Sequence, residues 1–439
     1  MLTFLRLLLG LALVGVVVAL AMILVPHRPT PPLAVLPADY EVPSGAGEYA
    51  MYLGDCAACH TAEGGERFAG GRPIESPLGT IYSTNITPDP ETGIGRYTLD
   101  QFRAALYDGI RADGAHLYPA MPYENYRKLT EEDVRALYHY FTEEVAPVRH
   151  QGTETSLPFP FNQRWGIRAW NWVALAQPGF RPNTEDPQIA RGAYLVEGPG
   201  HCGACHTPRN LVMAQDGTDA SSQAFLRGGE IDGWTAPDLR GRKSPGALWS
   251  AEQLKMLFAS GRSAHAAVTG EMSLVVEEST QHWTESDLDA MVAYLKSIAD
   301  PADPRPVRDP APTIALLTHP TQDMPLGARL YLDNCGACHF VSGKGADEVF
   351  PELDGNFLVN APSPTGLIEV ILHGSTAPST EIRPYRLRMP DFGHRLSDEE
   401  VAELATFLRQ AWTNDADPVT AATVAPLRKS RTGEASASN

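Results

Sequence analysis

Three short cysteine motifs constrain this chain more than any other feature of its sequence. Each motif has the form Cys-x-x-Cys-His. Together they are Cys56, Cys59 and His60; Cys202, Cys205 and His206; and Cys335, Cys338 and His339, which use all six cysteines. A disulfide framework would need cysteines that pair across the chain, whereas here each has its neighbour three residues away. The motifs therefore predict three separate cofactor sites rather than structural disulfides.

The spacing within each motif suits covalent heme attachment. Two cysteines one helical turn apart face the same edge of a porphyrin and can form two thioethers, while the next histidine ligates the iron. A zinc site would need a second ligand pair nearby, and a thioredoxin-like redox pair would need a strand-to-helix setting. The sequence shows neither setting, so we expect three covalently bound heme c groups.

The segments around the motifs repeat one order of elements. Each opens with a Gly-Ala pair and a tyrosine before its motif, and each closes with a helix. The predicted N-caps of the closing helices are Thr130, Thr284 and Ser397, followed three residues later by Asp133, Asp287 and Glu400. Only the glutamate completes a standard capping box. The repeat predicts a mainly α fold of three tandem class I cytochrome c domains joined by proline-rich linkers.

Composition places the boundaries between these parts. We expect an N-terminal membrane anchor or signal at 1–27, domains at 45–150, 185–299 and 324–413, linkers at 151–184 and 300–323, and a flexible tail at 414–439. The first linker is rich in proline and in large rings such as Trp165 and Trp170. Such rings favour packing within the chain, with a partner or membrane surface as the alternative.

The N-terminus carries an apolar run of 19 residues at 7–25, directly behind Arg6. This length is about enough to cross a hydrocarbon core as a helix. A cleaved signal peptide is the alternative, although its apolar region is normally shorter. The sequence favours a retained anchor, and both alternatives imply that most of the chain is exported.

Charge excludes one class of partner. The chain has 35 basic and 53 acidic residues, a formal net charge of -18. Such a surface repels phosphate backbones, so we expect no nucleic acid partner.

Each iron also needs a sixth ligand, and three methionines stand late in the repeats, before the closing helices. They are Met121, Met272 and Met389. Met272 lacks the proline that follows the other two and is the weakest candidate, while His116 and His394 are alternatives near the first and third. An iron with both axial positions filled mainly exchanges electrons, so three methionines predict relay sites.

The proximal histidines need a partner for their second ring nitrogen, commonly a backbone carbonyl. Segments around Pro77, Pro237 and Pro351 are candidates. In the first repeat the string STNI aligns better with the later two, and there Thr84 replaces the proline.

Several strings resemble one protein family. LGTIYSTNITPDPETGIGRYT, LYPAMPYENY, RGAYLVEGPGHCGACHTPRN and GWTAPDL are similar to the triheme cytochrome c subunit of membrane-bound bacterial alcohol dehydrogenases. The family includes the cytochrome subunits of flavin-dependent gluconate, sorbitol and fructose dehydrogenases. The resemblance covers nearly everything between about Gly45 and Trp412, and the retained N-terminal anchor departs from the cleaved signal that the family leads us to expect.

The resemblance implies a function outside catalysis. A separate catalytic subunit, with PQQ or FAD, would oxidise the substrate, and this chain would relay electrons to membrane ubiquinone on the periplasmic side of the inner membrane. By position, the six cysteines would bind heme, and the iron ligands would be His60, His206, His339, Met121, Met272 and Met389. Two alternatives are an independent electron carrier and a multiheme peroxidase or reductase with one open iron.

Overall fold

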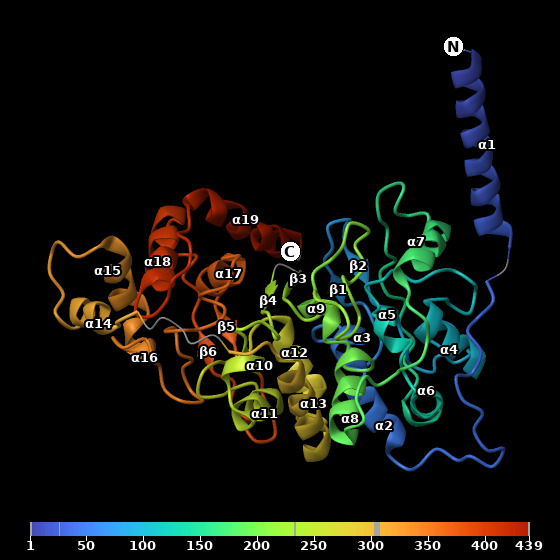
Figure 1. Cartoon of the computed structure of the whole chain (residues 1–439), viewed down its shortest axis with the longest axis horizontal. Coiled ribbons are helices and arrows are strands. Elements are labelled where there is room, and N and C mark those ends of the chain that lie inside the picture. The colour runs from blue at the N-terminus through green and yellow to red at the C-terminus, as the bar shows by residue number, and fades with distance from the viewer. Residues whose placement is uncertain (1, 26, 232–233, 303–307, 438–439) are drawn as a thin grey trace. The chain divides into compact units, whose positions relative to one another are not determined.

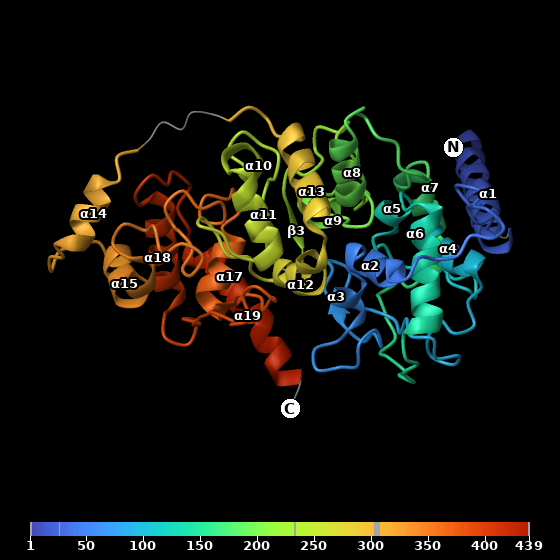
Figure 2. The same ribbon diagram turned by 90° about the horizontal axis from the view of Figure 1, so that it is seen from below.

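The computed structural model describes residues 2–25, 27–231, 234–302 and 308–437. The described chain is mainly helical, as predicted, and its strands form short antiparallel pairs (Figures 1 and 2). It divides into two compact units. The first comprises Met1–Arg181, Glu197–Ala204 and Arg209–Thr218; the second comprises Pro182–Val196, Cys205–Pro208 and Asp219–Asn439. The predicted three-domain boundaries stay a prediction.

The first unit carries the first motif. Its helices are α1 (Leu2–Leu24), α2 (Ala46–Leu53), α3 (Cys56–His60), α4 (Leu99–Asp108), α5 (Tyr123–Tyr126), α6 (Glu131–His139), the π-helix η1 (Tyr140–Glu144), the 3-10 turn η2 (Arg164–Gly166) and α7 (Ile167–Ala174). Strand β1 (Pro73–Ile74) pairs with β2 (Ile81–Tyr82).

The second and third motifs lie further along the chain. The next elements are α8 (Pro187–Glu197), α9 (Gly203–His206), β3 (Gly229–Ile231), β4 (Trp234–Ala236), α10 (Pro245–Leu248), α11 (Ala251–Ser260), α12 (Glu271–Glu278), η3 (Thr280–His282) and α13 (Glu285–Ile298). They are followed by α14 (Ala311–Thr318), α15 (Leu326–Asn334), α16 (Gly336–His339), α17 (Thr365–His373), β5 (Ser375–Thr376), β6 (Arg388–Met389), α18 (Asp398–Gln410) and α19 (Ala421–Ala437). Strands β3 and β4 pair, as do β5 and β6.

The closing helices begin where the sequence predicts. The side chains of Thr130, Thr284 and Ser397 accept hydrogen bonds from the main-chain N–H three residues later. Of these three, Ser397 alone takes part in a full capping box, with Glu400. These bonds are local, so the sequence pattern determines them directly.

Each opening helix crosses its closing helix at a glycine. A Cβ added at Gly47 in α2 would lie 2.6 Å from the Ala136 carbonyl oxygen and 2.7 Å from Tyr140 Cβ. Gly192 stands in the same position against Ala290 and Tyr294, and Gly327 against Glu403 and Phe407. In the second and third repeats this glycine belongs to the Gly-Ala pair, whereas in the first it is Gly47, directly after the pair Gly45-Ala46; in each repeat it permits a close helix crossing.

The first linker packs within the first unit. Asn171 of α7 is buried, where its side chain accepts a hydrogen bond from the Tyr123 hydroxyl (3.0 Å) and donates to the Asp108 carbonyl (3.1 Å). Trp170 donates its indole N–H to the Val212 carbonyl at 2.7 Å. Other rings of this segment stay on the surface, and Trp172 is 62% exposed.

The C-terminal segment differs from the expected flexible tail. Helix α19 packs against α17 and α18, with Val424 fully buried and Leu427 against the same core. The Arg428 guanidinium pairs with Asp398 at 2.6 Å and donates to the Leu396 carbonyl at 2.8 Å. The apolar residues at 424 and 427, one helical turn apart, give this polar segment a face that can be buried.

The N-terminal apolar run forms α1, and Arg168 donates hydrogen bonds to the carbonyls of Met22 and Val25 at its end. Taking only the described parts of the chain, no helix combines the length and the hydropathy that crossing a membrane requires.

Candidate heme sites

The turn before the first two motifs uses left-handed backbone. Asp55 has φ 49° directly before Cys56, and His201 has φ 36° directly before Cys202. This conformation is uncommon for residues other than glycine, and in the first repeat it joins the end of α2 at Leu53 to the start of α3 at Cys56 through two residues. In the third repeat, α16 follows α15 with Cys335 between them.

Each of the three motif histidines makes the same type of hydrogen bond, from its ring nitrogen Nδ1 to a main-chain carbonyl oxygen. His60 Nδ1 lies 2.6 Å from the Thr84 carbonyl oxygen, His206 Nδ1 lies 2.8 Å from that of Pro237, and His339 Nδ1 lies 2.9 Å from that of Pro351. A carbonyl can only accept, so Nδ1 carries the proton and Nε2 keeps its lone pair for a metal. In the first repeat the partner is therefore Thr84 and not Pro77.

The protonation state of these histidines also suits metal binding. Burial lowers the pKa of His60, His206 and His339, although the carbonyl contact of each acts in the opposite direction. Each imidazole is therefore neutral near pH 7, which is the form that ligates metals.

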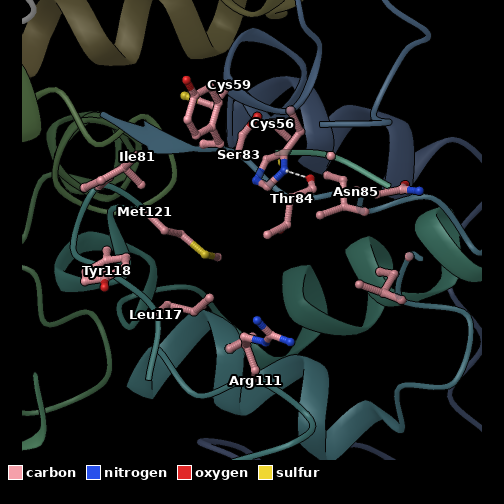
Figure 3. A pocket seen from close by; sticks show the side chains of 18 of the residues that line it. Cys56, Cys59, Ile81, Ser83, Thr84, Asn85, Arg111, Leu117, Tyr118 and Met121 are labelled. Carbon is pink, nitrogen blue, oxygen red and sulfur yellow. Dashed lines mark hydrogen bonds between the residues drawn. The ribbon is translucent and has the colours of Figure 1, made fainter. Parts of the chain in front are cut away.

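The first motif opens on a cavity of about 470 Å³. Cys56, Cys59 and His60 line this cavity together with Met121, so the structure brings these four predicted residues together. Figure 3 shows the Met121 thioether directed into the cavity and the hydrogen bond at Thr84 as a dashed line. Much of the remaining lining is apolar: Ile81, Ile86, Ile94, Phe102, Leu106 and Phe141.

These features fit a covalently held heme. The volume lies within the roughly 300–1,000 Å³ of cofactor pockets, and the apolar walls suit a porphyrin face. Two thiols and a histidine with a free Nε2 stand in one motif, and a thioether lines the same cavity. The residues present therefore match the donor set of a c-type heme with Met/His ligation.

Two arginines add positive charge to the cavity wall. Arg111 pairs with Asp113 at 2.8 Å, and the Arg164 guanidinium lies 4.3 Å from the ring centre of Tyr118. Heme carries two carboxylates on its propionate arms, and arginine is well suited to bind carboxylates. These arginines could therefore hold the polar edge of the cofactor.

The other candidate methionines occupy different elements. Met272 lies in the first turn of α12, and Met389 lies in β6, where it pairs with Ser375 of β5. Both side chains are partly exposed. Their role as iron ligands stays a prediction.

The alternative histidine ligands lie elsewhere. His116 is buried but is not among the residues that line the first cavity; its ring stands 6.2 Å from that of His27. His394 is exposed and pairs with Asp391 at 2.9 Å. In the first site, therefore, the thioether and not His116 faces the cavity.

The cavity wall also contains a residue that the sequence does not predict there. His201 directly precedes Cys202 of the second motif, yet it lines the cavity of the first. The available signal was a histidine beside the motif, but the sequence does not reveal which cavity the ring enters.

Comparison with known proteins matches this chain to cytochrome c proteins. The family model for cytochrome c matches residues 189–299 and 325–412. The chain is 45% identical to the cytochrome c subunit of alcohol dehydrogenase (quinone) of Gluconobacter oxydans, over 87% of this chain and 81% of the relative.

Two further relatives extend the comparison. The gluconate 2-dehydrogenase cytochrome c subunit of Pantoea cypripedii is 42% identical over 90% of this chain and 91% of the relative. The fructose dehydrogenase cytochrome subunit of Gluconobacter japonicus is 37% identical over 92% and 85%, respectively.

Proposed function

The chain belongs to the family of cytochrome c subunits of dehydrogenase complexes, and from this premise we propose that it relays electrons through three covalently bound heme c groups to membrane ubiquinone. It is an electron-transfer subunit and not the catalytic one, since the relatives are named as cytochrome subunits. The catalytic partner that we propose is a PQQ- or FAD-dependent dehydrogenase acting on CH–OH groups.

The observation that carries the proposal is the first cavity. Cys56, Cys59, His60 and Met121 line this cavity together, so the two thiols would form the thioethers, His60 would bind the iron through Nε2, and Met121 would supply the sixth ligand. His206 and His339 make the same hydrogen bond from Nδ1 to a main-chain carbonyl oxygen as His60 does, which supports the same role for them as iron ligands. Met272 and Met389 are the proposed sixth ligands of the second and third sites.

A bound heme supplies an iron that alternates between the ferrous and ferric states. The surrounding residues determine whether a substrate can reach the iron and at which potential the iron changes its oxidation state. With a histidine and a methionine both bound to the iron, no position would remain for a substrate, and this ligand pair would give a higher potential than two histidines. The carbonyl oxygen that accepts from Nδ1 holds the imidazole in one orientation, with Nε2 available to the iron.

We propose that the complex lies at the periplasmic face of the inner membrane. The apolar N-terminal segment at 7–25 supports export, and either this segment or docking on the catalytic partner would hold the chain at the membrane. The net charge of -18 argues against nucleic acid as a partner.

Purification from native membranes tests the subunit assignment. We expect a dehydrogenase subunit to co-purify with this chain, and deletion of this chain to abolish substrate-dependent quinone reduction. If the chain emerges alone and deletion leaves the dehydrogenase activity intact, it is an independent carrier. A high-spin heme that binds carbon monoxide would favour the peroxidase or reductase alternative.

Heme counting tests the number of cofactors. A pyridine hemochrome assay on the purified chain should give three hemes per polypeptide. Replacing both cysteines of one motif with serine, as in Cys202→Ser with Cys205→Ser, should leave two. A count of two in the unmodified chain would contradict the triheme proposal.

A further inference from the structure

A group of cationic and imidazole side chains lies at the end of α1, and none of them lines the first cavity. The group consists of His27, His116, Arg127 and Arg168, which all belong to the first compact unit. The ring centres of His27 and His116 are 6.2 Å apart, and Arg168 donates hydrogen bonds to two carbonyls at the end of α1. Figures 1 and 2 show α7, which carries Arg168, beside this end of α1. We call these four residues the cationic cluster.

Two members of the cationic cluster face the carboxylate of Asp108, which is buried. Arg127 Nη2 lies 4.0 Å from one of its oxygens, and His27 Nε2 lies 3.7 Å from the other. Thr30 donates to the same two oxygens, through its hydroxyl at 2.7 Å and its main-chain N–H at 2.8 Å. Both oxygens therefore already have donors. The two guanidinium groups outnumber this carboxylate, so the cluster keeps an excess of positive charge.

Several polar atoms of the cationic cluster are buried without a hydrogen-bond partner among the residues that the structure describes. They are Nε and Nη1 of Arg127, Nε of Arg168 and Nδ1 of His116. Arg127 and His116 are themselves only 6% and 7% exposed. Burying a guanidinium group costs free energy unless hydrogen bonds to acceptors compensate it. The cluster therefore needs acceptor atoms that the surrounding described chain does not supply.

The pKa shifts in the cationic cluster agree with its excess of positive charge. Burial lowers the pKa of His116 to about 4, and the charges of His27 and Arg168 act in the same direction. Burial also lowers the pKa of Arg127, and nearby Asp108 opposes this effect only in part. A negatively charged ligand would offset both shifts, because it favours the protonated forms.

Apolar side chains are exposed next to the cationic cluster. Trp172 and Val173 of α7 are exposed, and α1 exposes apolar side chains along its length. Trp170 donates its indole N–H to the Val212 carbonyl, which places the exposed apolar segment 211–213 beside the same helix. Exposed apolar patches mark contacts with proteins or membranes, and tryptophan is enriched at the interface between membrane and water.

We propose that the cationic cluster binds the phosphate group of an anionic phospholipid, whose acyl chains lie along the exposed apolar side chains of α1 and α7. Arginine is well suited to bind phosphate oxygens. Free phosphate would use the same donors but would leave the apolar surface beside them unexplained. The catalytic subunit could cover that surface, but its continuity with the apolar helix α1 favours lipid. The proposal rests on the proposed location at the membrane and requires no heme at any motif.

Native mass spectrometry of the full-length holoprotein in detergent counts the lipids that the protein retains. The probes are phosphatidylglycerol, which has a net negative charge, phosphatidylcholine, which has none, and inorganic phosphate. We expect the unmodified chain to retain phosphatidylglycerol in preference to phosphatidylcholine. Excess inorganic phosphate should not displace the lipid, because it lacks the acyl chains.

Arg168→Gln tests the cationic cluster, because glutamine removes the charge and keeps a polar side chain. Loss of a charge-assisted hydrogen bond should raise the apparent Kd for phosphatidylglycerol about tenfold. Arg149→Gln is the matched control, since Arg149 lies in the same unit but is exposed and pairs with Glu91 at 2.6 Å. We expect the control to bind the lipid as the unmodified chain does.

Trp172→Ser supplies a second test if Arg168→Gln fails to fold. Trp172 is exposed, so its replacement leaves the core of the unit intact. We expect retention of phosphatidylglycerol to fall several-fold, because the acyl chains lose an apolar contact. Unchanged retention in this variant would overturn the proposal.

Four other results would overturn the proposal. They are equal retention in Arg168→Gln and the unmodified chain, equal loss in the Arg149→Gln control, equal retention of the two lipids, and displacement of the lipid by inorganic phosphate. Loss of the dehydrogenase subunit from purified Arg168→Gln complex, with lipid retention unchanged, would overturn it in favour of a docking surface for that subunit. Failure of the proposed function would appear elsewhere, as recovery of the unmodified chain from the soluble periplasmic fraction or as fewer than three hemes.

Discussion

Replacement of Gly47 by alanine tests the helix crossing on which the first repeat is built. The added Cβ would lie 2.7 Å from Tyr140 Cβ and 2.6 Å from the Ala136 carbonyl oxygen. Carbon atoms pack best at about 3.5–4.0 Å, so the first contact is too close by roughly 0.8 Å. The carbonyl is main chain and cannot turn aside, so α2 and α6 would have to separate.

The expected magnitude follows from two opposing effects. Overpacking a well-packed core costs about 1–3 kcal/mol, and the fixed carbonyl places Gly47→Ala near the upper end. Alanine regains up to about 1 kcal/mol of helix propensity relative to glycine. The net loss in the free energy of unfolding is therefore about 2 kcal/mol, or a fall of about 4–8 °C in Tm for a unit of this size.

Thermal unfolding of the holoprotein, followed by far-UV circular dichroism, measures this change. Gly166→Ala is the matched control: Gly166 has right-handed backbone, and nothing lies within 4 Å of its added Cβ. We expect its Tm to equal or slightly exceed that of the unmodified protein. If Gly47→Ala melts no lower than Gly166→Ala, the close crossing inferred for α2 and α6 is wrong.

Three further predictions concern ligation, capping and pH. Met121→His should keep a low-spin heme but lower the midpoint potential of the first site in a spectroelectrochemical titration, because two histidines give a lower potential than Met/His; an unchanged potential would exclude Met121 as the ligand. Ser397→Ala should cost about 1 kcal/mol in denaturant unfolding, because α18 loses its N-cap, and no loss would contradict that role. Burial acts to raise the pKa of Asp108, but contacts with His27 and Thr30 outweigh it and lower that pKa. The stability that Asp108 contributes is thus present above about pH 4 and lost as pH falls through its folded pKa, so Asp108→Asn should destabilise the protein at pH 7 and much less at pH 3 in urea titrations.

Features determined by neighbouring residues were predictable from the sequence. The N-caps at Thr130, Thr284 and Ser397 depend on a spacing of three residues, and all three bonds form as expected. The carbonyl partners of His206 and His339 were predictable because Pro237 and Pro351 follow their motifs at corresponding places. In the first repeat the sequence left both Pro77 and Thr84 as candidates, and the structure selects Thr84.

Features determined by contacts between distant segments were not predictable in this way. The position of the His201 ring depends on Gly54 and Tyr126, which belong to another repeat. The segment after Thr413 is polar on average, and average composition concealed the apolar pair Val424 and Leu427 that lets α19 pack. Predicting the position of the His201 ring or the packing of α19 would require knowing which distant segments of the chain come into contact.

The bonds from the motif histidines to main-chain carbonyls have a consequence for how such a protein can evolve. A carbonyl oxygen belongs to every residue, so substitution at Thr84, Pro237 or Pro351 changes a side chain and leaves the acceptor in place. Substitution at these three positions therefore keeps the hydrogen bond that orients each motif histidine. In the triheme protein that we propose, differences among the potentials would then arise mainly on the methionine side of each heme and in the walls around it, and redesign of the potentials should begin there.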